Sequence, residues 1–501
     1  MFMVMELDPF ICRQAVLARD IRFDGRFFTA VTSTGIYCRP ICPARPPKAE
    51  NCRYYASAAA AQAAGFRPCL RCRPETAPGL GAWRGASSTV SRAMSLIDLG
   101  ALDADDVESL ATRLGVGERQ LRRLFLKHLG ASPIAVAQTR RVLVAKQLIH
   151  ETNLSMTQIA HAAGFGSVRR FNETMRALFG RPPSDLRRAR LETVASQAPI
   201  TLSLGYRPPF DWDGIVAFLA ARAIPGVECV EAGVYRRTIE LDGVSGEIAV
   251  VNEPDRHRLR ATIRFGKLAA LPAIIARLRR LFDLDADPEA IGSLLARDAR
   301  LAPLVAARPG LRVPGAWDGF ELAVRAIVGQ QITVVGATRL VGEIAQQFGQ
   351  TYDNASGKGG LSRLFPRPEV IARATLSGMP RARAAAISAM AGAAVADPTL
   401  FERGEDLAAS IERLRALPGV GDWTAHYIAM RALREPDAFP AADIGLMRAM
   451  DLGGGRPSPA ALAKHAATWR PWRAYAALHL WSYEAARSES RLQETDAAIA
   501  A

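Results

Sequence analysis

Hydrophobic and polar residues alternate in the middle of the chain, and this alternation predicts β-strands. Three runs place apolar side chains at every second position: Val234–Leu241, Glu247–Val251 and Leu259–Phe265. The dipeptide Asp242-Gly243 separates the first two runs and predicts a tight hairpin turn. A helical stretch at about Trp212–Ala223 interrupts the strands, so this part of the chain is expected to mix strands and helices.

The rest of the chain has the spacing of amphipathic helices. It starts in residues 90–190 and resumes from 268 to the end, with apolar residues three or four positions apart. Pro, Gly and Ser are frequent in 75–89, and 191–199 lacks periodicity, so both segments are predicted to be linkers. The Gly-rich stretch Thr351–Gly360 is predicted to be an irregular loop. The pattern indicates a multidomain α+β protein with four parts: 1–75, 90–190, 200–267 and 268–501.

Composition narrows the class of protein. The chain has 501 residues, of which 49% are hydrophobic and 23% charged, which is typical of globular domains and excludes long disorder. No apolar run reaches the roughly 18 residues needed to span a bilayer. The first residues include Glu6 and Asp8 and no basic segment, so a signal peptide is not expected. We therefore expect a protein of the cytoplasm with no membrane partner.

Positive charge is concentrated in the first 200 residues. They carry +12 of the net +15, and residues 201–501 carry only +3. Such asymmetry favours a polyanion as the partner of the N-terminal part. A solvated basic surface in an Arg-rich protein would give the same charge, and charge alone leaves both interpretations open.

Four cysteines are spaced as two metal-binding pairs. Three residues separate Cys38 from Cys42, and after 26 further residues two residues separate Cys69 from Cys72. Such spacing suits a tetrahedral zinc ion, and because the first histidine is His128, the ligands are expected to be thiolates only. Zinc sites of this kind are most often purely structural. The other early cysteines, Cys12 and Cys52, fall outside the paired spacing and are predicted to be buried or incidental.

The residues around these pairs carry a more specific signal. TGIYCRPICPAR and AAGFRPCLRCRP resemble the N-terminal methylphosphotriester repair domain of Ada proteins over about residues 8–75. The resemblance implies that Cys38 accepts a methyl group from an alkylated DNA phosphate, as a zinc-bound thiolate. The thioether product makes the transfer stoichiometric. Methylation reduces the cluster's net charge from −2 to −1, which should strengthen binding to DNA. A zinc domain that only tethers the rest of the chain to DNA is the alternative.

Two helix-turn-helix patterns follow. Helical runs flank the Gly-containing turns at Gly115–Gly117 and Gly164–Gly166, as in DNA-reading motifs. With the ending FGRPPSDLRRAR, the pair resembles the AraC-type DNA-binding domain, which implies promoter DNA and RNA polymerase as partners. The basic side chains of the two second helices would then contact DNA: Arg119, Arg122, Arg123, Lys127, Arg169, Arg170 and Arg176.

The segment LPGVGDWTA at Leu417–Ala425 predicts a helix–hairpin–helix turn. Gly419 and Gly421 would let backbone N–H groups approach a DNA phosphate at a helix N-terminus. About 20 residues later, Asp443 stands in an otherwise apolar stretch, FPAADIGLMRAM. A hairpin that only binds DNA, and a carboxylate that only caps a helix, remain the simpler interpretations.

The C-terminal part carries three further motifs: YRPPFDWDGIVAFLAARA, RPGLRVPGAWDGFELAVRAIVGQQI and WRPWRAYAALHLWSYEA. Together with the hairpin they resemble the AlkA-like 3-methyladenine DNA glycosylases II over about residues 200–490. The resemblance implies a TBP-like α/β subdomain, a helical body and a pocket for a flipped base. Trp423, Tyr427, Trp481 and Phe218 would line this pocket, and Asp443 would stabilise the sugar cation. For Phe218, ordinary core packing is the alternative.

Absences and departures refine this expectation. Trp423 stands where glycosylase/lyases of this fold carry a Schiff-base lysine, and the only lysine after residue 400 is Lys464, so a monofunctional glycosylase is expected. No cysteine follows Cys229, which excludes an iron–sulfur cluster in the helical body. Gln331 replaces the family's apolar DNA wedge, and Ile444 follows Asp443 where relatives carry an aromatic residue.

These observations predict a DNA-alkylation repair enzyme. It would release alkylated purines such as 3-methyladenine and 7-methylguanine from double-stranded DNA, and it would be fused to a methyl-accepting transcription regulator associated with the nucleoid. The expected metals are one zinc ion on the four cysteines and a monovalent cation on backbone carbonyls of the hairpin. The alternative is an adaptive-response regulator whose glycosylase half is inactive.

Overall fold

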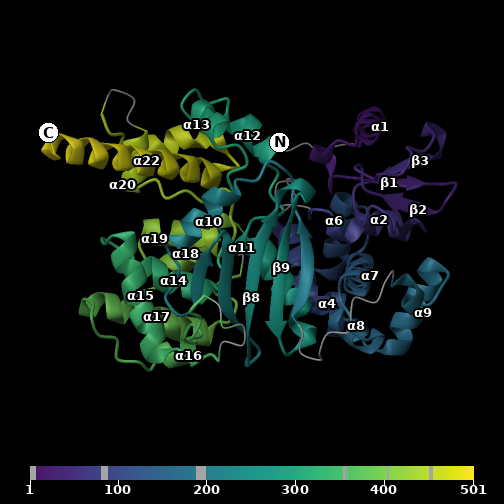
Figure 1. Cartoon of the computed structure of the whole chain (residues 1–501), viewed down its shortest axis with the longest axis horizontal. Coiled ribbons are helices and arrows are strands. Elements are labelled where there is room, and N and C mark those ends of the chain that lie inside the picture. The colour runs from purple at the N-terminus through teal and green to yellow at the C-terminus, as the bar shows by residue number, and fades with distance from the viewer. Residues whose placement is uncertain are drawn as a thin grey trace. The chain divides into compact units, whose positions relative to one another are not determined.

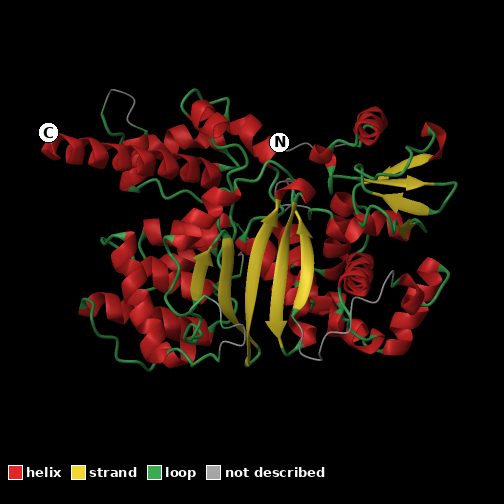
Figure 2. Cartoon of the chain, in the orientation of Figure 1, coloured by secondary structure: helices red, strands yellow, loops and turns green. Residues whose placement is uncertain are grey.

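The computed structural model describes residues 7–79, 88–187, 199–353, 357, 359–402, 406–450 and 455–500. Of the predicted linkers, residues 80–87 and 191–198 lie outside the described residues, as do 354–356 and 358 of the predicted Gly-rich loop. The chain forms two compact units. The first comprises Met1–Pro208, Ile239–Arg279 and Leu284–Ala286, and the second Pro209–Thr238, Arg280–Asp283 and Asp287–Ala501. Figure 1 labels the elements and Figure 2 distinguishes helices from strands.

The Cys-rich segment is a small sheet with two helices. Its elements are α1 (Pro9–Ala18), η1 (Ile21–Phe23), β1 (Phe28–Val31), β2 (Ile36–Cys38), η2 (Ala49–Asn51), β3 (Cys52–Tyr55), α2 (Ala58–Ala63), β4 (Arg67–Pro68) and η3 (Pro74–Thr76). The strand order is β3-β1-β2-β4. Strand β1 pairs antiparallel with β2 and β3, whereas β2 and β4 are parallel. The parallel pair places the ends of β2 and β4, and the cysteines there, at the same edge of the sheet.

The next segment is entirely helical: α3 (Ser88–Asp98), α4 (Ala101–Ala104), α5 (Val107–Arg113), α6 (Glu118–Leu129), α7 (Pro133–Glu151), α8 (Met156–Ala162), α9 (Val168–Phe179) and η5 (Pro183–Leu186). The two predicted helix pairs are confirmed as α5–α6 and α8–α9. Asp106 and Ser167 cap α5 and α9 by accepting backbone N–H bonds, and Ser155 forms a reciprocal capping box with Gln158 at α8. Caps of this kind satisfy N–H groups that the first helical turn leaves unpaired.

A second sheet contains β5 (Ile200–Gly205), β6 (Glu228–Glu231), β7 (Val234–Leu241), β8 (Val244–Glu253) and β9 (Arg258–Phe265), with α10 (Trp212–Ala220) after β5 and the short turns η6 (Pro254–Arg256) and η7 (Leu268–Ala270) near β9. Its strand order is β5-β9-β8-β7-β6. The three predicted strands are confirmed, although β8 begins before Glu247. Asp242 and Gly243 have φ values of 50° and 76°, the left-handed conformation that a two-residue hairpin turn requires. The predicted helix is confirmed but ends at Ala220, before Ala223.

The remaining elements form a helical body: α11 (Leu271–Leu281), α12 (Pro288–Leu295), α13 (Leu301–Ala307), α14 (Gly319–Val328), α15 (Val334–Phe348), α16 (Pro368–Ile371), α17 (Arg381–Ala396), α18 (Leu407–Arg415), α19 (Asp422–Arg431), α20 (Ile444–Ala449), α21 (Pro459–His465), η8 (Ala466–Trp469) and α22 (Arg473–Ala500). Helix α14 is buried on nearly every side and packs against α15, α17 and α19. Helices α20 and α22 pack together, as Figure 1 shows for the yellow end of the chain. The expected mixed α/β architecture is therefore confirmed, and none of the described helices is long and apolar enough to cross a membrane.

Candidate metal centre and candidate active site

Four cysteine thiols meet where β2 and β4 end. Cys38 is the last residue of β2, and Cys69 directly follows β4. The backbone N–H of Cys69 donates to the carbonyl of Tyr37 over 3.0 Å, which extends the parallel pairing up to the cluster. The Sγ atoms of all four predicted ligands lie within 4.8 Å of one another: Cys38, Cys42, Cys69 and Cys72.

Backbone and side-chain donors surround this cluster. The N–H of Arg39 donates to Sγ of Cys72, and that of Arg71 to Sγ of Cys69, each over 3.3 Å. The guanidinium of Arg39 pairs with Asp24, which is 1% exposed, and donates to Oγ1 of Thr76 over 2.7 Å. Burial opposes the charge of Arg39, but the Asp24 carboxylate outweighs burial and raises the pKa of Arg39. These contacts fix the cluster as outer partners fix metal ligands.

The cluster fits zinc. Four thiol donors within this range suit a tetrahedral ion with Zn–S bonds of about 2.3 Å. Cys69 and Cys72 are buried, whereas Cys38 and Cys42 are partly exposed, so among the four it is Cys38 and Cys42 that are open to an outside reactant. Cys12 lies outside the cluster, and burial, aided by the charge of Asp8, raises its pKa to about 11. Cys52, also outside, is partly exposed and donates to the carbonyl of Lys48.

The predicted DNA-contacting arginines and Lys127 are exposed on α6 and α9. Two of them are paired within their own helix: Arg122 with Glu118 and Arg169 with Glu173. Exposed ion pairs of this spacing contribute little stability. Each arginine can therefore exchange its glutamate partner for a DNA phosphate with little loss of stability. The remaining predicted residues on these helices are Arg119, Arg123, Lys127, Arg170 and Arg176, all exposed.

In the second unit, three N–H groups converge on the carboxylate of Asp443. Trp423 Nε1 donates to Oδ2 over 2.8 Å, Trp481 Nε1 to Oδ1 over 2.9 Å, and the backbone N–H of Leu446 to Oδ1 over 2.8 Å. The last bond caps α20, so the simple capping role is real and coexists with the two indole contacts. A carboxylate offers about four acceptor positions. Within the described part of the chain three of these positions are filled, which leaves one on Oδ2.

Aromatic rings surround this carboxylate. Trp423 and Tyr427, one turn apart on α19, are stacked with ring centroids 5.2 Å apart and planes 10° apart. Trp481, on α22, lies 6.3 Å from Tyr427 at 58°. Three of the four residues predicted for the base pocket are therefore brought together around Asp443. All are partly exposed, although Trp423 and Tyr427 cover one ring face of each other by stacking.

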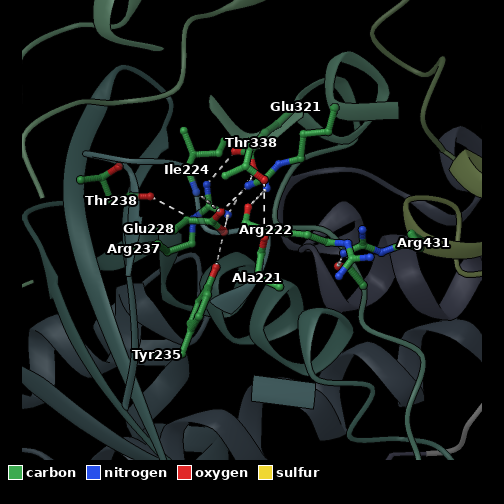
Figure 3. A network of polar contacts seen from close by, with 12 residues as sticks. Ala221, Arg222, Ile224, Glu228, Tyr235, Arg237, Thr238, Glu321, Thr338 and Arg431 are labelled. Carbon is green, nitrogen blue, oxygen red and sulfur yellow. Dashed lines mark hydrogen bonds and ion pairs between the residues drawn. The ribbon is translucent and has the colours of Figure 1, made fainter. Parts of the chain in front are cut away.

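Phe218 joins this group through two arginines. Its ring lies 3.8 Å from the guanidinium carbon of Arg222 and 4.8 Å from that of Arg431. Arg431 donates to the hydroxyl of Tyr427 over 2.7 Å, and Figure 3 shows the guanidinium groups of Arg222 and Arg431 next to each other. Burial opposes ionisation of Tyr427, but the two cations outweigh burial and lower its pKa. Burial, reinforced by the charge of Arg431, lowers the pKa of Arg222.

A buried ionic network lies beside these arginines (Figure 3). Glu228 accepts from Arg237 over 3.2 Å and also pairs with Arg325, while Glu321 accepts from Arg237 over 2.7 Å and Arg325 over 2.8 Å. Tyr235 donates to Glu228 over 2.6 Å. Burial would raise the pKa of Glu228, but Arg325 and Arg237 lower it to about 2. Buried charges persist only when paired in this way, and the network fixes the segment that carries Arg222.

The hairpin turn precedes α19. Gly419 has a φ of 75°, and a Cβ there would lie 2.4 Å from the Cβ of Ala386, so this position requires glycine. Gly421 is exposed and precedes the first helical residue, Asp422. A helix N-terminus with open backbone can receive a phosphate, although the carboxylate of Asp422 adds an opposing charge.

The two residues at which the sequence departs from the family pattern both lie on the surface. Gln331 is exposed, with a φ of 60°, just beyond α14. Ile444 is 54% exposed and starts α20. Both side chains are thus accessible to whatever binds at this surface.

Together these residues can bind a flat cationic ring on aromatic faces and hold a negative charge beside it. Nothing in the sequence pattern marks Arg222 and Arg431, because the sequence predicts a helix at both positions and arginine on a helix is usually solvated, although Arg222 lies beyond the end of α10. Their spacing of four residues from Phe218 and Tyr427 is the one signal that pairs them with the pocket. Gln330, whose side chain donates to the Gly419 carbonyl of the hairpin turn, has no comparable spacing to a pocket residue.

Comparison with known proteins agrees with this arrangement. Three family models match: the metal binding domain of Ada at residues 11–75, a helix-turn-helix domain at 110–189 and the AlkA N-terminal domain at 201–318. The probable bifunctional transcriptional activator/DNA repair enzyme AlkA of Mycobacterium tuberculosis is 43% identical over 94% of this chain and 95% of its own length. DNA-3-methyladenine glycosylase 2 of Escherichia coli is 34% identical over 56% of this chain and 97% of its own. The 3-methyladenine DNA glycosylase structure from Archaeoglobus fulgidus is 25% identical, with a TM-score of 0.50 over 56% of this chain and 97% of that one.

Proposed function

This chain belongs to the family of bifunctional transcriptional activators and DNA repair enzymes that includes AlkA of Mycobacterium tuberculosis, and we propose how its residues divide that work. The protein is a 3-methyladenine DNA glycosylase fused to a zinc-binding, methyl-accepting and DNA-binding regulator. The proposed domains are 1–75, 90–190, 200–267 and 268–501.

We propose Asp443 as the catalytic carboxylate. The supporting observation is that two indole N–H groups hold it while one position of Oδ2 stays open. An alkylated purine already carries positive charge and leaves without protonation, so the main demand on the enzyme is to stabilise the sugar cation. Trp423, Tyr427 and Trp481 offer π faces to the cationic base. A regulator with an inactive glycosylase half would need no such arrangement.

The test is the identity of the products. Chromatography after incubation with methylated duplex DNA should show free 3-methyladenine and 7-methylguanine from the wild type and none from Asp443→Asn. Because Trp423 occupies the position where lyases carry their lysine, the strand should stay intact until it is heated in alkali. Strand cleavage without heating would contradict the proposed monofunctional reaction.

We propose Cys38 as the methyl acceptor. Four thiolates can hold zinc, and zinc would keep the cysteine sulfur deprotonated. Cys38 is one of the two partly exposed cysteines of the cluster. Sulfur attacks the methyl carbon of the phosphotriester, and the phosphodiester leaves with the bonding electron pair. Mass spectrometry should find one added methyl group on Cys38 in the wild type. Methylation found on Cys42 instead would reassign the acceptor.

We propose that α6 and α9 bind promoter DNA and that this part of the protein also contacts RNA polymerase. The exposed arginines and the activator function of the relatives support both, and they imply residence on the nucleoid. Footprinting with and without polymerase should show an extended protected region if the contact exists.

Carbonyls of the hairpin turn are also proposed to hold a monovalent cation, which predicts stronger DNA binding in K⁺ than in a bulky organic cation. The Gly419 carbonyl already accepts a bond from Gln330, so other carbonyls of the turn would be the ligands.

A further inference from the structure

The loop after α14 is tied to the hairpin turn by one side chain. Nε2 of Gln330 donates to the carbonyl of Gly419 over 2.9 Å and to Oγ1 of Thr424 over 3.0 Å. A glutamine amide has two N–H donors, and both are used here. The two acceptors lie in the hairpin turn and in the first turn of α19, 89 and 94 residues further along the chain.

A third element holds the backbone of the same residue. The guanidinium of Arg383, near the start of α17, donates to the carbonyl oxygen of Gln330 over 2.5 Å. Gln330 therefore connects α14, α17 and the hairpin through three hydrogen bonds. Its side chain is only partly buried, so packing alone would leave it free to adopt other rotamers.

The next residue is the exposed tip of this loop. Gln331 has a φ of 60°, a conformation that a side chain with a Cβ adopts only when its surroundings impose it. The neighbouring apolar side chains Ile332 and Val335 are 36% and 78% exposed. A rigid, exposed tip of this kind can fill the gap in a duplex from which a base has been removed.

We propose that Gln330 is a positioning residue: by binding the hairpin turn, it fixes Gln331 in the place where it can enter the base stack. This proposal rests on the glycosylase activity proposed above. The hairpin would bind the phosphate backbone while Gln331 enters the base stack nearby. Gln331 can therefore fill the gap only if it is held at a fixed distance from the hairpin turn. Gln330 sets that distance without touching substrate.

The test compares one lesion in two pairing contexts. Single-turnover release of 7-methylguanine is measured opposite cytosine and opposite an abasic residue, where little unpairing is required. Gln330→Ala should slow release opposite cytosine about tenfold, as expected from losing two ordinary hydrogen bonds at a step that depends on them. Opposite the abasic residue its rate should stay within twofold of the wild type. Gln346→Ala, an exposed glutamine on α15 that bonds to Arg363, is the matched control and should change neither rate.

Two further measurements distinguish positioning from a general structural role. Gln331→Ala should give the same selective loss, and the Gln330→Ala/Gln331→Ala double variant should be no slower than either single variant, because both changes disable one device. The fluorescence rise of 2-aminopurine next to the lesion, which reports flipping, should shrink in both single variants while affinity for undamaged duplex stays the same.

Equal loss in both pairing contexts, additive effects of the two changes, or an unchanged rate for either single variant would each overturn the proposal. If the wild type itself releases no base, the proposed glycosylase function fails. If the wild type is active and Gln330→Ala lacks the selective loss, only this inference fails.

Discussion

The indole nitrogen of Trp423 donates a 2.8 Å hydrogen bond to Oδ2 of Asp443, the same oxygen that retains an open acceptor position. Trp423 and Asp443 are 20 residues apart in the sequence. They meet because Trp423 lies on α19 and Asp443 caps the start of α20. The indole thus both offers a ring face and orients the carboxylate. Trp481 does the same for Oδ1, so loss of either N–H should let the carboxylate rotate.

The first prediction concerns this bond. Trp423→Phe retains an aromatic face and removes the N–H donor. We expect the single-turnover rate of 3-methyladenine release to fall about tenfold, as for a hydrogen bond to a charged group worth about 1.5 kcal/mol, with little change in substrate affinity. If affinity falls and the rate does not, Trp423 acts only as a binding surface.

The second prediction concerns charge at the hairpin. Asp422 is half-exposed at the start of α19, next to Gly421, where it would repel a phosphate. Asp422→Asn should tighten binding to undamaged duplex severalfold at low salt, and the gain should shrink at high salt. Fluorescence anisotropy at two salt concentrations measures this, with the exposed Glu369→Gln on α16 as control. Unchanged or weaker binding would mean that DNA does not approach this helix end.

The third prediction concerns zinc retention. Asp24 is buried and pairs with Arg39, whose backbone and side chain contact Cys72. Asp24→Asn should weaken zinc binding about 10-fold or more, as loss of outer-shell support does in other metal sites. Competition with a chromophoric chelator gives the affinity. The control, Asp20→Asn, removes a carboxylate from a more exposed pair with Arg22 and should leave the affinity unchanged; equal weakening in both would contradict the role of Asp24.

The fourth prediction concerns pH. Burial, with help from Arg308 and against Asp211, lowers the pKa of His479 from 6.5 to about 4. The unfolded chain therefore binds this proton at higher pH than the folded chain, so stability should fall as pH drops from about 7 to 4. One such group contributes a loss of about 3 kcal/mol.

Urea unfolding of the wild type and His479→Leu at pH 7.5 and pH 4.5 measures this effect. The variant should lose less stability between the two pH values, whereas the exposed His161→Gln should behave like the wild type. Parallel losses in His479→Leu and the wild type would rule out His479 as the source.

Local structure was predictable where a residue decides its own backbone. Asp242-Gly243 turns the predicted hairpin through its own positive φ values, and Ser155 and Ser167 cap their helices through bonds to residues three positions on. Element ends were less predictable. The helix starting at Trp212 stops at Ala220, and two residues later the carbonyl of Arg222 accepts from Arg325 of the buried network over 2.5 Å.

Residues of the candidate active site were predictable only through family resemblance, whereas the spacing of the four cysteines alone predicted the metal centre. Asp443 and Trp423 carry recognisable flanking motifs, whereas Arg431 fits the pattern of an ordinary solvated helix residue. It is buried because the carbonyls of Pro314 and Gly315, more than a hundred residues earlier, accept its N–H groups. Long-range partners of this kind leave no periodic trace in the sequence.

The most direct test of the account is the single-turnover rate of 3-methyladenine release by Asp443→Asn at saturating enzyme. The side chain keeps its size, and its single amide oxygen can accept either from Trp423 or from Trp481 and Leu446. It loses the charge that stabilises the sugar cation. If Asp443 stabilises the sugar cation, the rate should be at least about 100-fold below the wild type, with DNA affinity retained. A rate within threefold of the wild type would contradict it.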